Sequence, residues 1–175
     1  AQLYWDGGQG LDESRKQVVR GVIGERHQTL RFQLPPALAD LRALKFDPAG
    51  TYSAFDPRMP ELEALDRSEA YVAAVREAVG SRCDLLFGTH GQFTAAGAIR
   101  LARRLERFDP LWFEEPVPPD LPEEMATVAR ATTIPIATGE RLTTKVEFAR
   151  VLALGAARIL QPNLGRAGGL LEGKK

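Results

Sequence analysis

Residues 111–116 read Leu-Trp-Phe-Glu-Glu-Pro, and this stretch decides the fold. A short apolar run ends in two adjacent carboxylates and is stopped by a proline, which is typical of a buried parallel strand whose C-terminal end delivers acid to a site. Side chains alternate between the two faces of a strand, so Glu114 shares a face with Trp112 while Glu115 points to the other side. We therefore interpret Glu114 as a site residue and Glu115 as a structural one.

Similar apolar runs recur on both sides of this stretch and alternate with amphipathic helical patterns. Further strands are predicted over residues 43–47, 84–87, 134–140 and 157–163. The helices between them are predicted to begin at Ser68, at Thr94, near Glu123, and at Thr143 or Thr144. The later units recur about every 25 residues, the size of a strand and a crossover helix that leads to a parallel neighbour.

Two architectures of parallel strands fit this alternation, an open doubly wound sheet and part of a (β/α)8 barrel. No glycine-rich nucleotide fingerprint follows the first strand, which disfavours the doubly wound sheet. The predicted fold class is therefore α/β, a partial (β/α)8 barrel of the TIM type over residues 41–175. Residues 1–40 are predicted to form an N-terminal segment with a helix and a short strand.

The composition disfavours several classes of protein. Lys plus Arg and Asp plus Glu both number 23, so the net charge is zero and neither nucleic acid nor a membrane is an expected partner. Cys83 is the single cysteine, so the chain can form no intrachain disulfide and no cysteine-rich metal site. No apolar run approaches the length of a membrane span, and the N-terminus lacks the apolar region of a signal peptide, so a cytoplasmic location is expected.

Polar or ionisable side chains stand at the C-terminal end of every predicted strand. Strand alternation predicts an inward-facing set made of Lys45, Asp47, His90, Glu114, Glu140 and Asn163. Barrel interiors are ordinarily apolar, so this concentration is a functional signal. Glu114 and Glu140, on adjacent strands, could bind a hard cation such as Mg²⁺. The metal would stabilise the charge that develops when a neighbouring carbon loses its proton, with a nearby Lys or His as base.

Structural roles are the alternatives for the same side chains. The pair of glutamates could form a salt bridge with an arginine at the barrel rim. Lys45 could form a rim ion pair with Asp47 or Glu114, and His90 could be a hydrogen-bonded structural histidine.

Five motifs in this order resemble the enolase superfamily, in particular its mandelate racemase and galactonate-type acid-sugar dehydratase branch. They are Leu-Lys-Phe-Asp (44–47), Leu-Phe-Gly-Thr-His-Gly (86–91), Trp-Phe-Glu-Glu-Pro (112–116), Ala-Thr-Gly-Glu-Arg (137–141), and Leu-Gln-Pro-Asn with Gly-Gly (160–163 and 168–169). Their order and spacing match barrel strands two to six. The resemblance implies a Mg²⁺-dependent lyase (Mn²⁺ as the alternative ion) that removes the proton α to the carboxylate of an acid sugar through a metal-stabilised enolate. It also implies a small-molecule sugar-acid substrate and a homo-oligomer for a full-length protein.

The resemblance implies a role for each site residue. Glu114 and Glu140 resemble metal ligands, and His90 resembles the acid or base of galactonate-type dehydratases. Lys45 resembles a catalytic lysine near the substrate carboxylate. The positions that resemble substrate contacts are Arg141, Asp47 and Asn163.

The sequence departs from the family pattern at three of these places. Gly88 stands where the family has an aspartate metal ligand, Asp47 replaces the second lysine of a Lys-x-Lys pair, and Asn163 replaces an aspartate. Loss of one lysine base makes a racemase or cycloisomerase less favoured than a dehydratase. A whole barrel takes about 250 residues, so a fragment is predicted, and a non-catalytic remnant of the fold is the second hypothesis.

Overall fold

The computed structural model describes residues 42–49 and 57–175, so the helix and strand predicted within residues 1–40 lie outside the described part. The described strands are β1 (Ala43–Phe46), β2 (Asp84–Gly88), β3 (Trp112–Glu114), β4 (Ile136–Thr138) and β5 (Ile159–Leu160). They form one sheet in the order β1-β2-β3-β4-β5, and every neighbouring pair is parallel.

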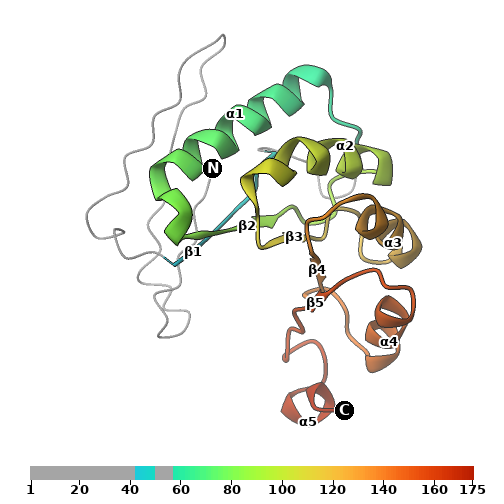
Figure 1. Ribbon diagram of the computed structural model, residues 1–175. Coiled ribbons are helices and arrows are strands. Elements are labelled where there is room, and N and C mark those ends of the chain that lie inside the picture. Colours follow the sequence, from blue (N-terminus) through green and yellow to red (C-terminus); the bar gives the residue numbers. More distant parts are fainter. Residues whose placement is uncertain (1–41, 50–56) are drawn as a thin grey trace.

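The helices follow the strands in strict alternation. They are α1 (Leu62–Val79), α2 (Ala95–Leu105), α3 (Pro122–Ala131), α4 (Lys145–Ala153) and α5 (Leu170–Gly173), with short 3₁₀ turns η3 (Gly80–Arg82) and η4 (Glu106–Phe108). Figure 1 shows α1 to α4 following one another along one side of the sheet. A doubly wound sheet would instead carry helices on both faces and reverse its strand order at one point. The prediction of a partial (β/α)8 barrel is therefore confirmed. No helix of the described part is both long and apolar enough to cross a membrane.

The two faces of the sheet differ sharply in chemistry. The helix-facing side chains of β1, β2 and β3, with Ile136 of β4, are apolar and belong to the main core: Leu44, Phe46, Leu85, Phe87, Phe113 and Ile136. Thr138 of β4 lies on the same face as Ile136 and is buried but polar. Phe46, Phe87 and Phe113 lie in register across β1, β2 and β3, and their rings meet edge to face with centroids 5.4 and 6.3 Å apart. The other face carries Lys45, Gly88 and Glu114. The alternation read from the sequence thus separates core from site correctly in β1, β2 and β3.

Helix starts follow the predicted caps in two cases and differ in one. Thr94 accepts a hydrogen bond from Gly97 N at the start of α2, and Thr144 forms a capping box with Glu147 at the start of α4. The prediction that Ser68 caps a helix is wrong, because α1 begins at Leu62 and Ser68 is buried in its interior. Residues N-terminal to Ser68 extend the same apolar stripe, since Leu65 is buried in the core, so packing carries the helix back toward Pro60.

The paired strands are shorter than the apolar runs that predict them. β5 covers two residues of the predicted strand 157–163. Gln161 N still donates to Thr138 O at 2.9 Å, but Pro162 has no N–H with which to continue the ladder. Asn163 therefore lies beyond the strand, and the alternation that would make it face inward no longer applies.

Candidate active site

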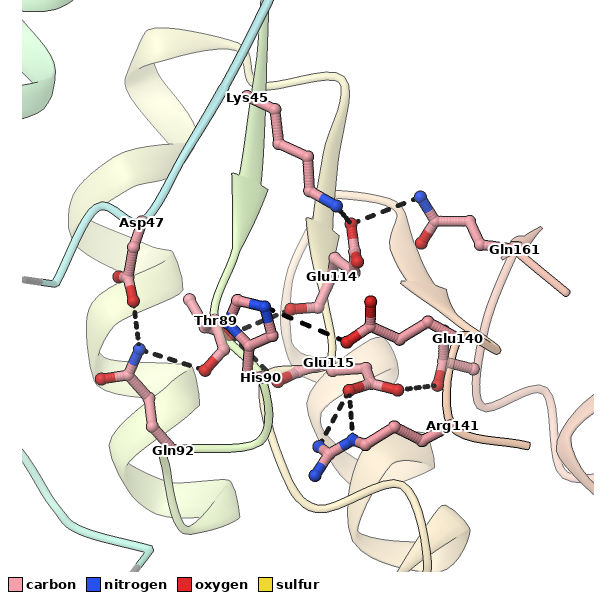
Figure 2. Close-up of polar contacts among 11 residues, drawn as sticks. Lys45, Asp47, Thr89, His90, Gln92, Glu114, Glu115, Glu140, Arg141 and Gln161 are labelled. Carbon is pink, nitrogen blue, oxygen red and sulfur yellow. Dashed lines mark hydrogen bonds and ion pairs between the residues drawn. The ribbon is translucent and has the colours of Figure 1, made fainter. Parts of the chain in front are cut away.

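Glu114 is the centre of a polar cluster at the C-terminal ends of the strands. Its Oε2 lies 2.5 Å from Lys45 Nζ, and Gln161 Nε2 donates to the same oxygen at 3.3 Å (Figure 2). The side chain of Glu114 is 4% exposed, whereas that of Lys45 is 35% exposed. The rim ion pair that the sequence left open for Lys45 and Glu114 is therefore formed, and the Lys45 side chain remains partly exposed to solvent.

His90 stands beside this cluster on the loop that follows β2. Its backbone has a φ of 55°, in the left-handed region. The two neighbours of His90 tie the loop to the end of β3. Thr89 Oγ1 donates to the carbonyls of Glu114 and Glu115 at 2.9 and 3.0 Å, and Gly91 N donates to Glu115 O at 2.6 Å. These bonds hold the imidazole at the rim, where its side chain is 47% exposed.

Glu140 faces His90 across the site. Its Oε1 lies 4.0 Å from His90 Nε2, as Figure 2 shows. Glu140 faces inward as predicted, but strand alternation is not the reason. Strand alternation pairs it with Ile136, but Ile136 packs in the core on the helix side. Gly139 adopts a φ of 137° between them, and this turn re-aims Glu140 toward the site.

Glu115 and Arg141 form a second, buried ion pair. Arg141 Nε donates to Glu115 Oε2 at 2.8 Å, and the second guanidinium nitrogen is also 2.8 Å from that oxygen. Thr138 Oγ1 donates to the other carboxylate oxygen at 3.5 Å. Glu115 is fully buried, and this burial raises its pKa while the Arg141 charge opposes the rise. Glu115 thus faces away from Glu114 as expected. Arg141 pairs with Glu115, and its role as a substrate contact stays a prediction.

Asp47 turns away from Lys45 toward the loop after β2. Its Oδ2 accepts from Gln92 Nε2 at 2.7 Å and its Oδ1 from Ala49 N at 2.8 Å. Gln92 is itself buried and also donates to Thr89 O at 3.1 Å. Asp47 therefore supports this loop through hydrogen bonds, and the substrate contact that the resemblance implies stays a prediction.

We expect the Asp47 carboxyl to titrate far above an ordinary aspartate. Burial raises its pKa from 3.8 to about 6, and the hydrogen bonds from Ala49 and Gln92 only partly offset this. Because the folded-state pKa lies above the unfolded value, the folded protein binds more protons between these limits. Its stability should therefore fall by about 2 to 3 kcal/mol as the pH rises from 4 to 6. An NMR titration of the carboxyl carbon measures the pKa directly, and a midpoint near 4 would contradict the expectation.

Asn163 is not brought to the site. The side chain is exposed, and its Oδ1 accepts from Arg166 N at 3.2 Å within the turn that leads to α5. Its amide therefore stabilises local backbone, a common use of asparagine in turns.

Three polar residues in and around the site were not predicted to act there. Gln161 contacts Glu114, while Thr89 and Gln92 hold the loop that carries His90. The available signal for Gln161 was a long polar side chain inside an apolar run. Thr89 and Gln92 gave no such signal, because their roles depend on partners 25 and 45 residues away.

The metal ligands that the resemblance implies do not fit these contacts. Mg²⁺ and Mn²⁺ bind oxygen acceptors, but Glu114 Oε2 is met by two hydrogen donors, the ammonium of Lys45 and the amide nitrogen of Gln161. Gly88, in register with Glu114, supplies no side chain. Within residues 42–49 and 57–175, no group of three His, Cys, Asp or Glu side chains is placed to hold a metal ion.

Comparison with known proteins gives one consistent group of relatives. The sequence profile described as "Enolase C-terminal domain-like" matches residues 35–175. A D-galactonate dehydratase of Xanthomonas oryzae pv. oryzae (strain PXO99A) is 34% identical over 98% of this chain and 47% of its own length. One from Xanthomonas euvesicatoria pv. vesicatoria (strain 85-10) is 36% identical over 93% of this chain and 42% of its own length. The chain thus spans about half the length of the curated relatives it matches.

Solved structures agree with this grouping. A Labrenzia alexandrii DFL-11 protein assigned to the mandelate racemase/muconate lactonizing enzymes is 65% identical with a TM-score of 0.75, covering 79% of this chain and 36% of that one. A mandelate racemase/muconate lactonizing enzyme from Sulfitobacter sp. is 57% identical with a TM-score of 0.74, covering 79% of this chain and 35% of that one.

Proposed function

Since the chain belongs to the enolase C-terminal domain-like family of the enolase superfamily, we propose that its site dehydrates a small acid sugar. The reaction would begin with loss of the proton α to the carboxylate and end with departure of the hydroxyl group from the next carbon. The D-galactonate dehydratases among its relatives support this substrate class.

The observation that carries the proposal is the ammonium of the half-buried Lys45 side chain, which lies beside the polar side chains of Glu114 and Gln161. An ammonium has three N–H donors, and the ion pair with the single oxygen Glu114 Oε2 uses one of them. The remaining donors suit a substrate carboxylate. Gln161 Oε1 is buried and has no hydrogen-bond partner among the described residues, so it offers an acceptor for a substrate hydroxyl. A carboxylate and a neighbouring hydroxyl together are the recognition elements of a hydroxy acid.

His90 is the residue that we assign to proton transfer. In the dehydration, the electron pair of the α C–H bond forms a C=C bond, and the C–O bond of the adjacent carbon breaks. His90 takes the α-proton and returns it to the leaving hydroxyl, so that water departs and the protons balance. The resulting enol then becomes the 2-oxo acid. Lys45 stabilises the negative charge that builds up on the carboxylate side while the proton is absent. No step is assigned to a metal ion, because the contacts of Glu114 do not fit one.

Substitution of His90 tests this proposal. A panel of sugar acids that includes D-galactonate would be incubated with the purified protein, and 2-oxo acid formation measured with a carbonyl reagent. We expect His90→Asn to lower kcat by at least about 100-fold, because it removes the acid/base group. Arg67→Ala, which breaks an exposed ion pair within α1, is the control and should leave turnover unchanged. Turnover that persists in His90→Asn, or its absence for every sugar acid, would contradict the proposal.

A further inference from the structure

Glu114 already has a cation beside it, and the chain itself supplies that cation. A carboxylate that is almost wholly removed from water needs a compensating positive charge. Lys45 Nζ provides this charge at 2.5 Å from Glu114 Oε2. A divalent ion at the same oxygen would have to displace the ammonium or lie against it, which charge repulsion opposes.

Gly88 is the residue that makes room for this lysine. It lies in register with Glu114 across β2 and β3, on the face that carries Lys45. A Cβ atom at position 88 would lie 2.8 Å from Cε of Lys45, closer than real Cβ contacts allow. A side chain at position 88 would therefore push the flexible end of Lys45 out of the position that it now occupies beside Glu114.

Gln161 contributes a second hydrogen-bond donor to the carboxylate of Glu114. Its amide nitrogen, not its oxygen, faces Glu114 Oε2. Lys45 and Gln161 together give this carboxylate oxygen two donors from opposite sides, as Figure 2 shows. With both donors in place, this carboxylate oxygen is satisfied without a further ion.

We propose that the ammonium of Lys45 takes the place of a divalent cation beside Glu114, so that the site carries its positive charge as a fixed side chain. This deepens the proposed function and rests on it only for the identity of the anion that Lys45 binds. The charge offered to that anion is then independent of metal concentration.

Mn²⁺ is the ion used to test whether Lys45 takes the place of a divalent cation. Its binding is measured by calorimetry and by the loss of the EPR signal of the free ion. We expect no saturable binding to the wild-type protein up to about 1 mM, the weak limit of specific association. The double variant Lys45→Ala/Gly88→Asp removes the stem and places a carboxylate in register with Glu114. It should bind Mn²⁺ at least about tenfold more tightly than the wild type, and its melting temperature should rise when Mn²⁺ is added. Lys145→Met, at an exposed lysine that begins α4, is the control and should behave as the wild type.

Saturable Mn²⁺ binding to the wild-type protein that is lost in Glu114→Gln overturns the proposal. This arm decides the question even if the double variant does not fold. The Mn²⁺-binding and melting-temperature readouts do not use turnover, so they test this proposal separately from the proposed function. Turnover of a sugar acid that requires added Mn²⁺ would overturn the proposal that Lys45 takes the place of the divalent cation, and it would keep the proposed function. Absence of both turnover and Mn²⁺ binding would overturn the proposed function and keep the proposal that Lys45 takes the place of the divalent cation.

Discussion

Replacing Arg141 with alanine is expected to lower the free energy of unfolding by about 3 to 5 kcal/mol. Arg141 holds two guanidinium nitrogens 2.8 Å from Glu115 Oε2, and Glu115 has no exposed surface. Removing the arginine leaves a carboxylate in the interior with only the hydroxyl of Thr138, at 3.5 Å, as a side-chain partner. The loss of unfolding free energy comes mainly from the unpaired Glu115 charge that remains in the interior. Breaking a buried ion pair costs more than the pair contributes as a whole. Urea denaturation followed by circular dichroism measures the loss.

Two further variants separate the stranded charge from loss of the side chain itself. Arg141→Ala/Glu115→Gln removes the charge as well and should recover a large part of the lost stability. Arg150→Ala breaks an ion pair with Glu123 whose partners are both more than half exposed, so it should cost less than about 1 kcal/mol. A loss in Arg141→Ala as small as that in Arg150→Ala would show that the Glu115 charge is solvated after all.

Replacing Gly139 with alanine is expected to cost about 2 to 4 kcal/mol and to move Glu140 away from His90. The φ of 137° at this position is a conformation that side chains rarely tolerate. A Cβ atom there would also lie 2.9 Å from Gln161 N and 3.0 Å from the nearest side-chain atom of Phe148. The backbone contact is the costly one, because a strand cannot rotate aside as a flexible side chain can. Denaturation gives the stability, and the NMR shifts of the His90 ring report whether Glu140 has moved.

Gly155→Ala is the matched control for this substitution. Gly155 also has a positive φ, of 62°, but nothing lies within 4 Å of a Cβ atom placed there. It should cost only about 1 kcal/mol, the price of the left-handed conformation alone. Equal losses in the two variants would mean that backbone conformation, and not contact with Gln161 and Phe148, accounts for the effect at Gly139.

The strand order and most of the chemical difference between the two faces of the sheet follow from the amino-acid pattern. Residues 111–116 predict one buried strand with Glu114 and Glu115 on opposite sides, and the structure places them so. These inferences rest on local rules, because alternation within a strand and the spacing of strand-helix units need no knowledge of distant partners. The same rules fail where the strand ends. Beyond Thr138 the alternation no longer applies, so the direction of Glu140 depends on the backbone turn at Gly139.

Which polar groups contact one another depends on tertiary packing. Several side chains were plausible partners for Glu114, and the packing of β1 against β2 selected Lys45, because Gly88 leaves the space through which the lysine reaches. Packing likewise turned Asp47 to Gln92 and Arg141 to Glu115. Ion pairs and hydrogen bonds act over a few ångströms between residues far apart in the chain, so the sequence shows their members but not their pairing. The acids and bases of the site could therefore be named from the sequence, while the charge balance at Glu114 is a property of the folded chain.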